Sequence, residues 1–301
     1  MATKSPRKRS KISDFEILGR LGSGSFGTVF KVKRLEDGRE YVIKTVRIGE
    51  LPRDEQMAAI NEVKLLSKMD HDNVVRYYES FIDESGANLH IVMEYCDRGD
   101  LAGMMKRAKS RGSKSLPEER TWPIYLQILL GLHYIHTQRV LHRDMKTANV
   151  FLSSSSSQGG SGSGKKSLRV KIGDLGVAKL LGTTASFANT VIGTPYYLSP
   201  ELVQDLPYNS KSDMWALGVI LYECCTLHHP FDANNQCALI LKIIRGKFDP
   251  VPSENASSAL IDLTHRLLRQ DPAQRPSAAG LLRHPATQSE LSYYNLPLPA
   301  D

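Results

Sequence analysis

The chain changes character near Gly99: the residues before it favour strands, and those after it favour helices. Four strand-forming stretches, rich in β-branched and aromatic residues and separated by turns, lie at 15–21, 28–32, 41–46 and 89–95. Helical periodicity dominates afterwards, and an apolar run at 215–227 predicts a central, buried helix. A run of strands followed by a run of helices predicts an α+β chain with two lobes.

Bulk composition sets the scale of the fold and the class of partner. The 301 residues suit one large domain or two lobes that share a cleft, and a hydrophobic content of 41% supports a substantial core. Lys and Arg number 39 against 32 Asp and Glu, which gives a net charge of +7. This excess favours phosphorylated or acidic partners, but it is too diffuse to predict a specific nucleic-acid site.

The compartment is predicted from three further features. No apolar stretch is long enough to span a membrane, and the best, at 215–227, is interrupted by Gly218 and Glu223. The N-terminus lacks the apolar region of a signal peptide. The four cysteines form no CxxC pair, which favours reduced thiols over disulfides or a zinc site. We therefore expect a soluble, cytoplasmic protein without a membrane span.

The first fourteen residues are strongly basic. They contain Lys4, Arg7, Lys8, Arg9 and Lys11, and no acidic residue precedes Asp14. Such a run predicts a disordered, solvated tail at 1–14. The alternative is a signal for nuclear entry or for an anionic surface.

A helix is expected at 54–69, with one carboxylate on its apolar side. At about 100° per residue, Glu62 falls among Ala58, Ala59, Leu65, Leu66 and Met69. Burial of an unpaired carboxylate costs several kcal/mol. The pattern therefore predicts a cationic partner for Glu62.

Two further segments flank the middle of the chain. The sequence SLPE at 115–118 resembles a capping box, which predicts a helix capped by Ser115 and running to about His136. The stretch SSSSSQGGSGSGKKS at 153–167 cannot bury a core, so we expect a flexible insertion between two short paired strands, 150–152 and 170–172.

The stretch HRDMKTANVFL, at 142–152, combines dense polar chemistry with a buried strand. Asp144, Lys146 and Asn149 lie within six residues, and an apolar strand follows at once. A solvated charge pair and a turn would also explain these residues. The choice between the two readings depends on partners elsewhere in the chain.

Those partners occur in a fixed order. The motif GxGxxGxV spans 22–29, Lys44 follows on a strand, and Glu62 follows on a helix. After HRDMKTAN come the sequences DLG at 174–176 and SPE at 199–201. By this series the chain resembles the eukaryotic protein kinases over residues 15–286. The resemblance implies a bilobal fold, with an N-lobe at about 15–96, a C-lobe at about 97–286 and ATP in the cleft between the lobes.

The resemblance also assigns roles. Asp144 would accept the proton of the substrate hydroxyl, Lys146 would screen the moving phosphoryl group, and Asn149 and Asp174 would bind Mg²⁺. Lys44, fixed by Glu62, would neutralise the phosphates of ATP. The nucleotide-binding residues implied are Leu21, Gly22, Gly24, Gly27, Val29, Val42, Lys44, Met93, Glu94 and Cys96. Two structural contacts are also implied: Asp213 braces the catalytic loop, and Glu201 pairs with Arg275.

Within the serine/threonine class, the chain looks most like the NIMA-related (Nek) kinases. Four stretches carry this likeness: LHIVMEYCDRGDL, HRDMKTANVFL, ASFANTVIGTPYYLSPEL and LYECCTLHHPFDANNQCALILKIIRGKF. DLG departs from the common DFG, but Leu175 keeps its apolar character. The family resemblance places such a protein at the cytoskeleton, centrosome or basal body. It also suggests activation through Thr190, with Ser186 as second choice, and packing of Thr194 against the catalytic loop.

Partners and alternatives follow from the same comparison. The resemblance implies protein substrates, and either an upstream kinase or autophosphorylation in trans. The tail at 287–301 has no heptads, so we expect no coiled-coil dimerisation through it.

One alternative function is that of a pseudokinase scaffold, which binds nucleotide and protein partners. It predicts loss of Lys44, Asp144, Asn149 or Asp174, and all four are present. A small-molecule or calmodulin-regulated kinase is the other alternative.

Overall fold

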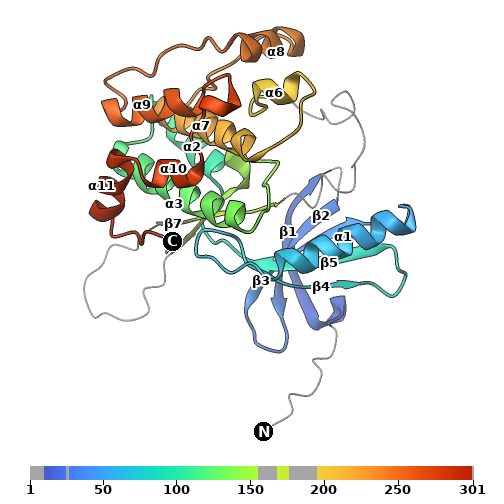
Figure 1. The fold of residues 1–301 in the computed structure, drawn as a ribbon. Helices are drawn as coiled ribbons and strands as arrows, with labels where there is room; N and C mark the ends of the chain where they lie inside the picture. The colour runs from blue at the N-terminus through green and yellow to red at the C-terminus, as the bar shows by residue number, and fades with distance from the viewer. Residues whose placement is uncertain (1–9, 25–26, 155–167, 176–194, 300–301) are drawn as a thin grey trace, which may run out of the picture. The chain divides into compact units, whose positions relative to one another are not determined.

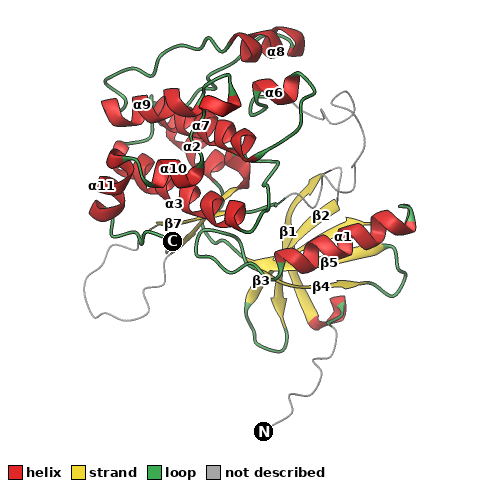
Figure 2. Cartoon of the chain, viewed as in Figure 1, coloured by secondary structure: helices red, strands yellow, loops and turns green. Residues whose placement is uncertain are grey.

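The computed structural model describes residues 10–24, 27–154, 168–175 and 195–299. Contacts divide the chain into two compact units. The first holds most of the residues up to Tyr95, and the second holds 72–74 and most of the residues from Cys96 onward. Strands make up most of the first unit and helices most of the second (Figure 2). The predicted α+β class is confirmed.

A five-stranded antiparallel sheet forms the first unit, in the order β1-β2-β3-β5-β4. The strands are β1 (Phe15–Gly24), β2 (Gly27–Arg34), β3 (Glu40–Arg47), β4 (Tyr77–Ile82) and β5 (Asn88–Glu94). Helix α1 (Arg53–Leu66) lies across one face of this sheet (Figure 1). Four of the strands match the predicted stretches, whereas β4 was not predicted.

Helix α1 buries a narrower stripe than its sequence suggests. Ala59, Val63 and Leu66 are buried, whereas Leu65 is 57% exposed and Ala58 is exposed as well. The predicted stripe was therefore wrong at residues 58 and 65. A helix that lies on one sheet buries only the side chains that point at that sheet, so an apolar residue beside the stripe stays in water.

The end of the basic N-terminal segment lies on the first unit. Residues Ile12–Asp14 form a 3-10 helix, η1, which leads into β1. Ser10 donates a hydrogen bond to Glu79, and Lys11 pairs with Glu84. The prediction of a disordered tail at 1–14 therefore fails for residues 10–14, because side-chain bonds to the β4–β5 hairpin hold them.

The second unit is mainly helical. Its α-helices are α2 (Leu101–Ser110), α3 (Glu118–Thr137), α6 (Pro200–Val203), α7 (Ser210–Thr226), α8 (Gln236–Arg245), α9 (Ser258–Leu267), α10 (Ala278–Leu282) and α11 (Pro285–Tyr293). Two 3-10 helices, η2 (Thr147–Asn149) and η3 (Pro272–Gln274), and a hairpin of β6 (Val150–Ser154) and β7 (Leu168–Ile172) complete it. Helix α7 is buried almost throughout, as its apolar sequence predicted.

One predicted helix boundary is wrong, and part of the predicted C-terminal tail is helical. Helix α3 begins at Glu118, its N-cap is Pro117, and Ser115 lies outside the helix. No side chain caps its start, and the hydroxyl of Thr121 donates to the carbonyl of Pro117, at 3.3 Å. Near the C-terminus, α11 extends into the expected tail, where Thr287 and Leu291 are buried, so residues 287–293 belong to the packed fold.

The predicted insertion is shorter than its composition suggests. Strands β6 and β7 pair as expected, but the ladder continues to Ser154 opposite Leu168. The amide and hydroxyl of Ser154 both donate to the carboxylate of Asp97, each at 2.7 Å. Residues 153 and 154 are therefore part of the strand, and residues 155–167 lie outside the described part of the chain.

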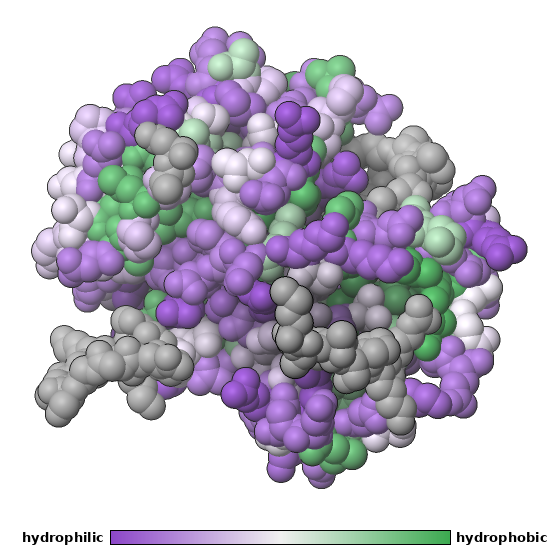
Figure 3. Space-filling model, turned by 60° about the horizontal axis from the view of Figure 1, so that its bottom comes forward, coloured by the Kyte–Doolittle hydropathy of each residue, from purple (hydrophilic) through white to green (hydrophobic). Residues whose placement is uncertain are grey.

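The surface turned to the viewer in Figure 3 is predominantly hydrophilic, and its hydrophobic side chains gather in small areas. Apolar atoms contribute much of the surface of a folded protein, so small exposed areas of this kind are ordinary. Among the described residues, none of the helices is both long enough and apolar enough to cross a bilayer.

Candidate active site

The glycine-rich turn joins β1 to β2 in the first unit. Gly22 lies opposite Val29, and Gly24 lies opposite Gly27, while residues 25–26 fall outside the described part of the chain. Gly27 has φ 145°, and a Cβ there would lie 1.8 Å from the carbonyl oxygen of Thr45. Only glycine fits this position, because the backbone of β3 passes too close for any side chain.

Strands β3 and β5 bring several of the predicted nucleotide-binding residues together. Val42 lies directly opposite Met93, and both side chains are buried. Tyr41 lies opposite Glu94, whose backbone amide donates to the carbonyl of Arg76.

The other predicted residues lie on β1 and β2 or after β5. On strand β2, which pairs with the other edge of β3, Val29 lies opposite Lys44. Leu21, at 53% exposure on β1, is far more open than Val42 and Met93. Cys96 follows β5 and is partly exposed.

Lys44 and Glu62 come from different elements of the first unit. Lys44 lies on β3, with a partly exposed side chain, and Glu62 lies on α1, also partly exposed. Antiparallel pairing of β3 with β5 fixes the backbone of Lys44 opposite Ile91. The predicted ion pair between Lys44 and Glu62 stays a prediction.

In the second unit, Asp213 organises the loop that precedes β6. The side chain is fully buried near the start of α7, and its two oxygens accept from the backbone amides of His142 and Arg143, at 3.0 and 3.1 Å. His136 contacts the same carboxylate at 2.8 Å, and the hydroxyl of Tyr208 donates to it. The predicted bracing role of Asp213 is confirmed.

These contacts determine the charge of the buried groups. Burial acts to raise the pKa of Asp213, but the hydrogen bonds from His136 and Tyr208 help to outweigh it, so the pKa lies below its ordinary value. Burial lowers the pKa of His142. The amide of Asp144 donates to Nδ1 of His142, at 3.3 Å, which matches a neutral ring with Nδ1 unprotonated.

The loop presents Asp144 between two donors. Lys146 Nζ lies 2.9 Å from Asp144 Oδ2, and Asn149 Nδ2 lies 3.0 Å from the same oxygen. Asn149 also donates to the carbonyl of Asp144, at 2.7 Å. Arg143, just before it, has φ 66°, a conformation that is uncommon outside glycine. The structure thus brings together Asp144, Lys146 and Asn149, with the Asp144 side chain 43% exposed.

The β6–β7 hairpin brings the two predicted metal ligands to one of its ends. Asn149 directly precedes β6, and Asp174 follows β7 by two residues. Val150 pairs with Ile172, and the amide of Gly173 donates to the carbonyl of Asn149, at 3.0 Å. Asp174 has φ 59°, and Leu175 beside it is buried. A carboxylate and an amide oxygen are ligands that Mg²⁺ accepts, so these residues fit the ion.

One network near this loop was missed in the sequence. Tyr197 bonds to Thr147 of η2, at 2.9 Å, and donates to Glu223 of α7, at 2.7 Å. Nδ1 of His229 lies 2.9 Å from the other oxygen of Glu223. A signal was available: Glu223 is a carboxylate in an apolar helix, so it needed partners for the same reason that Glu62 does.

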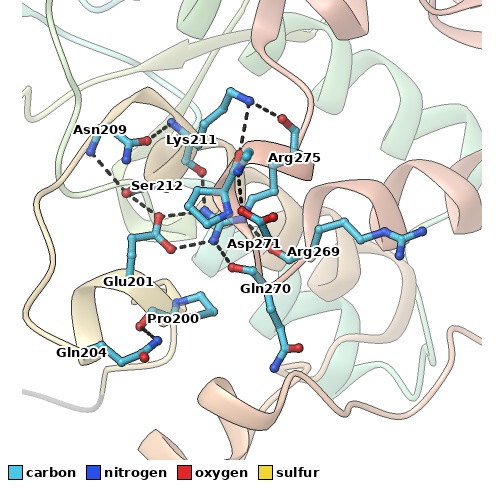
Figure 4. A network of polar contacts seen from close by, with 12 residues as sticks. Pro200, Glu201, Gln204, Asn209, Lys211, Ser212, Arg269, Gln270, Asp271 and Arg275 are labelled. Atoms are coloured by element: carbon cyan, nitrogen blue, oxygen red, sulfur yellow. Dashed lines mark hydrogen bonds and ion pairs between the residues drawn. The ribbon is translucent and has the colours of Figure 1, made fainter.

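Glu201 and Arg275 form a buried, bidentate ion pair, as predicted. The two guanidinium nitrogens lie 2.8 and 2.6 Å from the carboxylate oxygens. Figure 4 shows Ser212 donating to Glu201, and Arg275 reaching the carbonyl oxygens of its neighbours as well. Burial acts to raise the pKa of Glu201, but the bonds from Arg275 and Ser212 lower it overall. Every charged atom is therefore satisfied away from water.

Three predicted residues cannot be placed. Thr190, Ser186 and Thr194 lie at 176–194, outside the described residues, as does Gly176 of the DLG sequence.

Comparison with known proteins gives the family. The protein kinase domain family matches residues 15–286. Serine/threonine-protein kinase Nek1 of Mus musculus is 43% identical over 265 residues, which are 88% of this chain and 20% of that protein. Serine/threonine-protein kinase Nek5 of Homo sapiens is 40% identical over 283 residues, 94% of this chain and 38% of that protein. A probable serine/threonine-protein kinase, nek2 of Dictyostelium discoideum, is 40% identical over 274 residues, 90% and 62% of the two chains.

The chain thus spans between a fifth and somewhat under two thirds of the length of these relatives. Its own match to the kinase family covers most of its residues. The chain therefore belongs to the protein kinase family, and the relatives it resembles within that family are the Nek serine/threonine kinases.

Proposed function

We propose that the protein is an active serine/threonine kinase that transfers the γ-phosphate of ATP to Ser and Thr hydroxyls of protein substrates. The observation that carries this proposal is the position of Asp144. Its carboxylate lies between Lys146 and Asn149, in a loop whose backbone is bound by the buried Asp213. Positioning and electrostatics are the main tasks of a phosphoryl-transfer enzyme, and this arrangement supplies both.

Each residue has a task in that reaction. Asp144 orients the attacking hydroxyl and accepts its proton, while Lys146 offers positive charge beside the same carboxylate oxygen. Asn149 would hold Mg²⁺ together with Asp174, and the ion would neutralise charge on the phosphates. Lys44, on β3, would neutralise the phosphates further. The glycine-rich turn lets backbone amides approach the phosphates closely.

Activation is proposed through the segment at 176–194. Thr190 is the first candidate for phosphorylation and Ser186 the second, either by an upstream kinase or by autophosphorylation in trans. Support comes from Arg143, whose backbone Asp213 fixes directly beside Asp144. A phosphate that bound the Arg143 guanidinium would tie the segment to the catalytic aspartate. Residence at the cytoskeleton, centrosome or basal body is part of the same proposal.

Two substitutions test the chemistry. Asp144→Asn should lower kcat by at least about a thousandfold but leave ATP affinity nearly unchanged, because Asp144 acts on the acceptor hydroxyl. Asp174→Ala should also weaken Mg-ATP binding, because it removes a metal ligand. Phosphate transfer to a peptide library and calorimetric titration with Mg-ATP measure the two effects. Near-native turnover by Asp144→Asn would exclude the proposed role.

A further inference from the structure

Ser10 links the basic N-terminal segment to the sheet of the first unit. Its hydroxyl donates to Glu79 Oε2, on β4, at 2.8 Å, across 69 residues of sequence. The other oxygen of Glu79 accepts from the guanidinium of Arg34, on β2. Ser10 therefore donates one hydrogen bond to a carboxylate that is already paired with a cation.

Among the residues that the structure describes, few other contacts hold residues 10–14 in place. Lys11 Nζ lies 2.7 Å from Glu84, but the two side chains are 60% and 87% exposed, and exposed pairs contribute little to stability. Asp14 closes the short helix η1 by accepting from the amide of Lys11, at 2.8 Å, and its carbonyl accepts from the amide of Leu35. So few contacts predict local opening well below the free energy of global unfolding, and opening would give an enzyme access to Ser10.

The sequence before Ser10 reads Arg7-Lys8-Arg9. Arginine pairs with carboxylates in a bidentate geometry, so three consecutive cations suit a protein kinase whose substrate groove is lined by acidic side chains. Ser13, three residues later, lacks this setting: Lys11 and Ile12 precede it, and its side chain is exposed. The two serines thus differ in both surroundings and contacts.

We propose that Ser10 is phosphorylated by a kinase that selects serines preceded by basic residues. We propose further that the phosphate detaches residues 10–14 from the sheet. In the transfer, the Oγ proton passes to a base of the modifying kinase and the Oγ–P bond forms. The bond from the γ-phosphorus to the bridging oxygen of ATP breaks, and ADP leaves. This inference is independent of the activity proposed for the chain itself.

Detachment follows from the charges around Ser10. The phosphorylated oxygen can no longer donate to Glu79, and it brings a charge of about −1.5 to −2 to within contact of that carboxylate. Arg34 cannot offset the charge alone, because it also lies 3.8 Å from Asp37 and is shared with Glu79. Its guanidinium stacks over the rings of Phe15 and Tyr41, which hold it in the sheet. Repulsion by Glu79 therefore prevails.

Hydrogen exchange measures the detachment. The full chain is prepared with phosphoserine at position 10 by genetic-code expansion. Exchange is followed at the amide of Leu35, because it donates to the carbonyl of Asp14 and so joins the segment to the sheet. A hydrogen bond to a charged group contributes ~1.5–3 kcal/mol, so its loss should speed exchange by at least about tenfold. Phosphoserine at position 13 is the matched control, because it adds the same charge three residues away, and it should change exchange less than about threefold. Unchanged or slower exchange with phosphoserine at position 10 would overturn the proposal.

A second variant isolates the cause. In Glu79→Gln, the phosphate at position 10 no longer faces a carboxylate, so the added phosphate should speed exchange less than about threefold relative to Glu79→Gln alone. An undiminished acceleration would show that Glu79 is not responsible, and would overturn the mechanism.

The modifying enzyme is tested separately. The probe is the catalytic subunit of cAMP-dependent protein kinase, with Mg-ATP, on the Asp144→Asn full chain, so that the chain does not label itself. Mass spectrometry should find phosphate on Ser10. The double variant Arg7→Ala with Lys8→Ala lacks two of the three cations before Ser10, and its phosphorylation at Ser10 should be at least about tenfold lower. Phosphate absent from Ser10, or incorporated equally in the double variant, would contradict selection by basic residues.

Discussion

Asp213 shows how one buried side chain can determine the conformation of a loop. The backbone amides of His142 and Arg143 both donate to it, which helps to hold Arg143 at φ 66°. Such a backbone conformation costs of order 1–3 kcal/mol and persists only where the surroundings enforce it. The carboxylate thus stabilises a strained turn directly before Asp144, the residue on which the proposed chemistry depends.

Arg143 carries the prediction for activation. If a phosphate on Thr190 binds the Arg143 guanidinium, Thr190→Ala and Arg143→Ala remove the same contact. Each should lower the activity of phosphorylated enzyme at least about tenfold, and the double variant should be scarcely worse than either, because contacting residues are non-additive. Phosphate mapping and kinetic assays measure this. Full activity in Thr190→Ala, or simple additivity, would exclude the switch.

The residues that could be predicted from sequence are those whose motif fixes their neighbours. Asp213 and the Glu201–Arg275 pair were identified in this way, although Glu201 and Arg275 are 74 residues apart. His136, which is 77 residues from Asp213, and Tyr208 were missed as partners of that carboxylate. Neither stands in a pattern that demands a contact. The packing of α3 beside α7 brings His136 to Asp213, whereas Tyr208 lies five residues before Asp213 in the chain.

At the scale of the element, composition misled where backbone bonding decides. Serines 153 and 154 look like the start of a flexible tract, yet both belong to a β ladder, and Ser154 also bonds to the carboxylate of Asp97. Ser115 looks like a helix cap, yet α3 begins after Pro117. The apolar run, by contrast, correctly predicted the buried helix α7, because a helix that is apolar nearly all round has no face for water.

The β6–β7 hairpin gives a prediction about the segment between its strands. Ser154 pairs with Leu168, so residues 155–167 can be replaced by a two-residue Asn-Gly turn that suits a tight hairpin. We expect kcat to change less than about twofold, and stability to be kept or raised slightly, because closing a shorter loop costs less entropy. Urea unfolding and a kinase assay measure both.

A matched variant tests the boundary of that replacement. The same shortened hairpin with Ser154→Ala loses the hydroxyl bond to Asp97 and should be less stable by about 1 kcal/mol. A large loss of activity in the shortened hairpin with Ser154 intact would reveal a contact of residues 155–167 that matters for turnover. Equal stability of the two variants would show that the hydroxyl bond from Ser154 to Asp97 is dispensable.

For the whole molecule, three histidines with lowered pKa values predict how stability varies with pH. Desolvation lowers the pKa of His142, His90 and His133 from the ordinary 6.5, so these rings bind protons at lower pH in the folded chain than in the unfolded chain. The unfolded chain binds protons at these rings once the pH falls below about 6.5. The free energy of unfolding should therefore decrease as the pH is lowered below about 6.5, and it should level off once the pH is below the pKa values of the folded chain. Asp213 and Glu201, whose pKa values are lowered from 3.8 and 4.5, affect only more acidic solutions.

The size of this effect is measurable through His142. If one histidine binds a proton only in the unfolded chain, the free energy of unfolding at pH 5.5 is lowered by up to about 1.4 kcal/mol. Both tryptophans, Trp122 and Trp215, are buried in the second unit with His142, so their fluorescence reports unfolding of that unit in urea. The fall in stability between pH 7.5 and 5.5 should be smaller in His142→Asn, and an equal fall in both proteins would contradict the assignment.

The hairpin also bears on how such a chain can change over generations. Its ladder separates the end near Asn149 and Asp174 from the end at Ser154 by four residue steps, or roughly 13 Å at ~3.3 Å per residue. Paired backbone therefore separates any insertion or deletion beyond Ser154 from Asn149 and Asp174, the two residues proposed to bind Mg²⁺. The length of the segment at 155–167 can then change between lineages without affecting the chemistry. A serine- and glycine-rich tract is the kind of sequence that replication slippage would produce there.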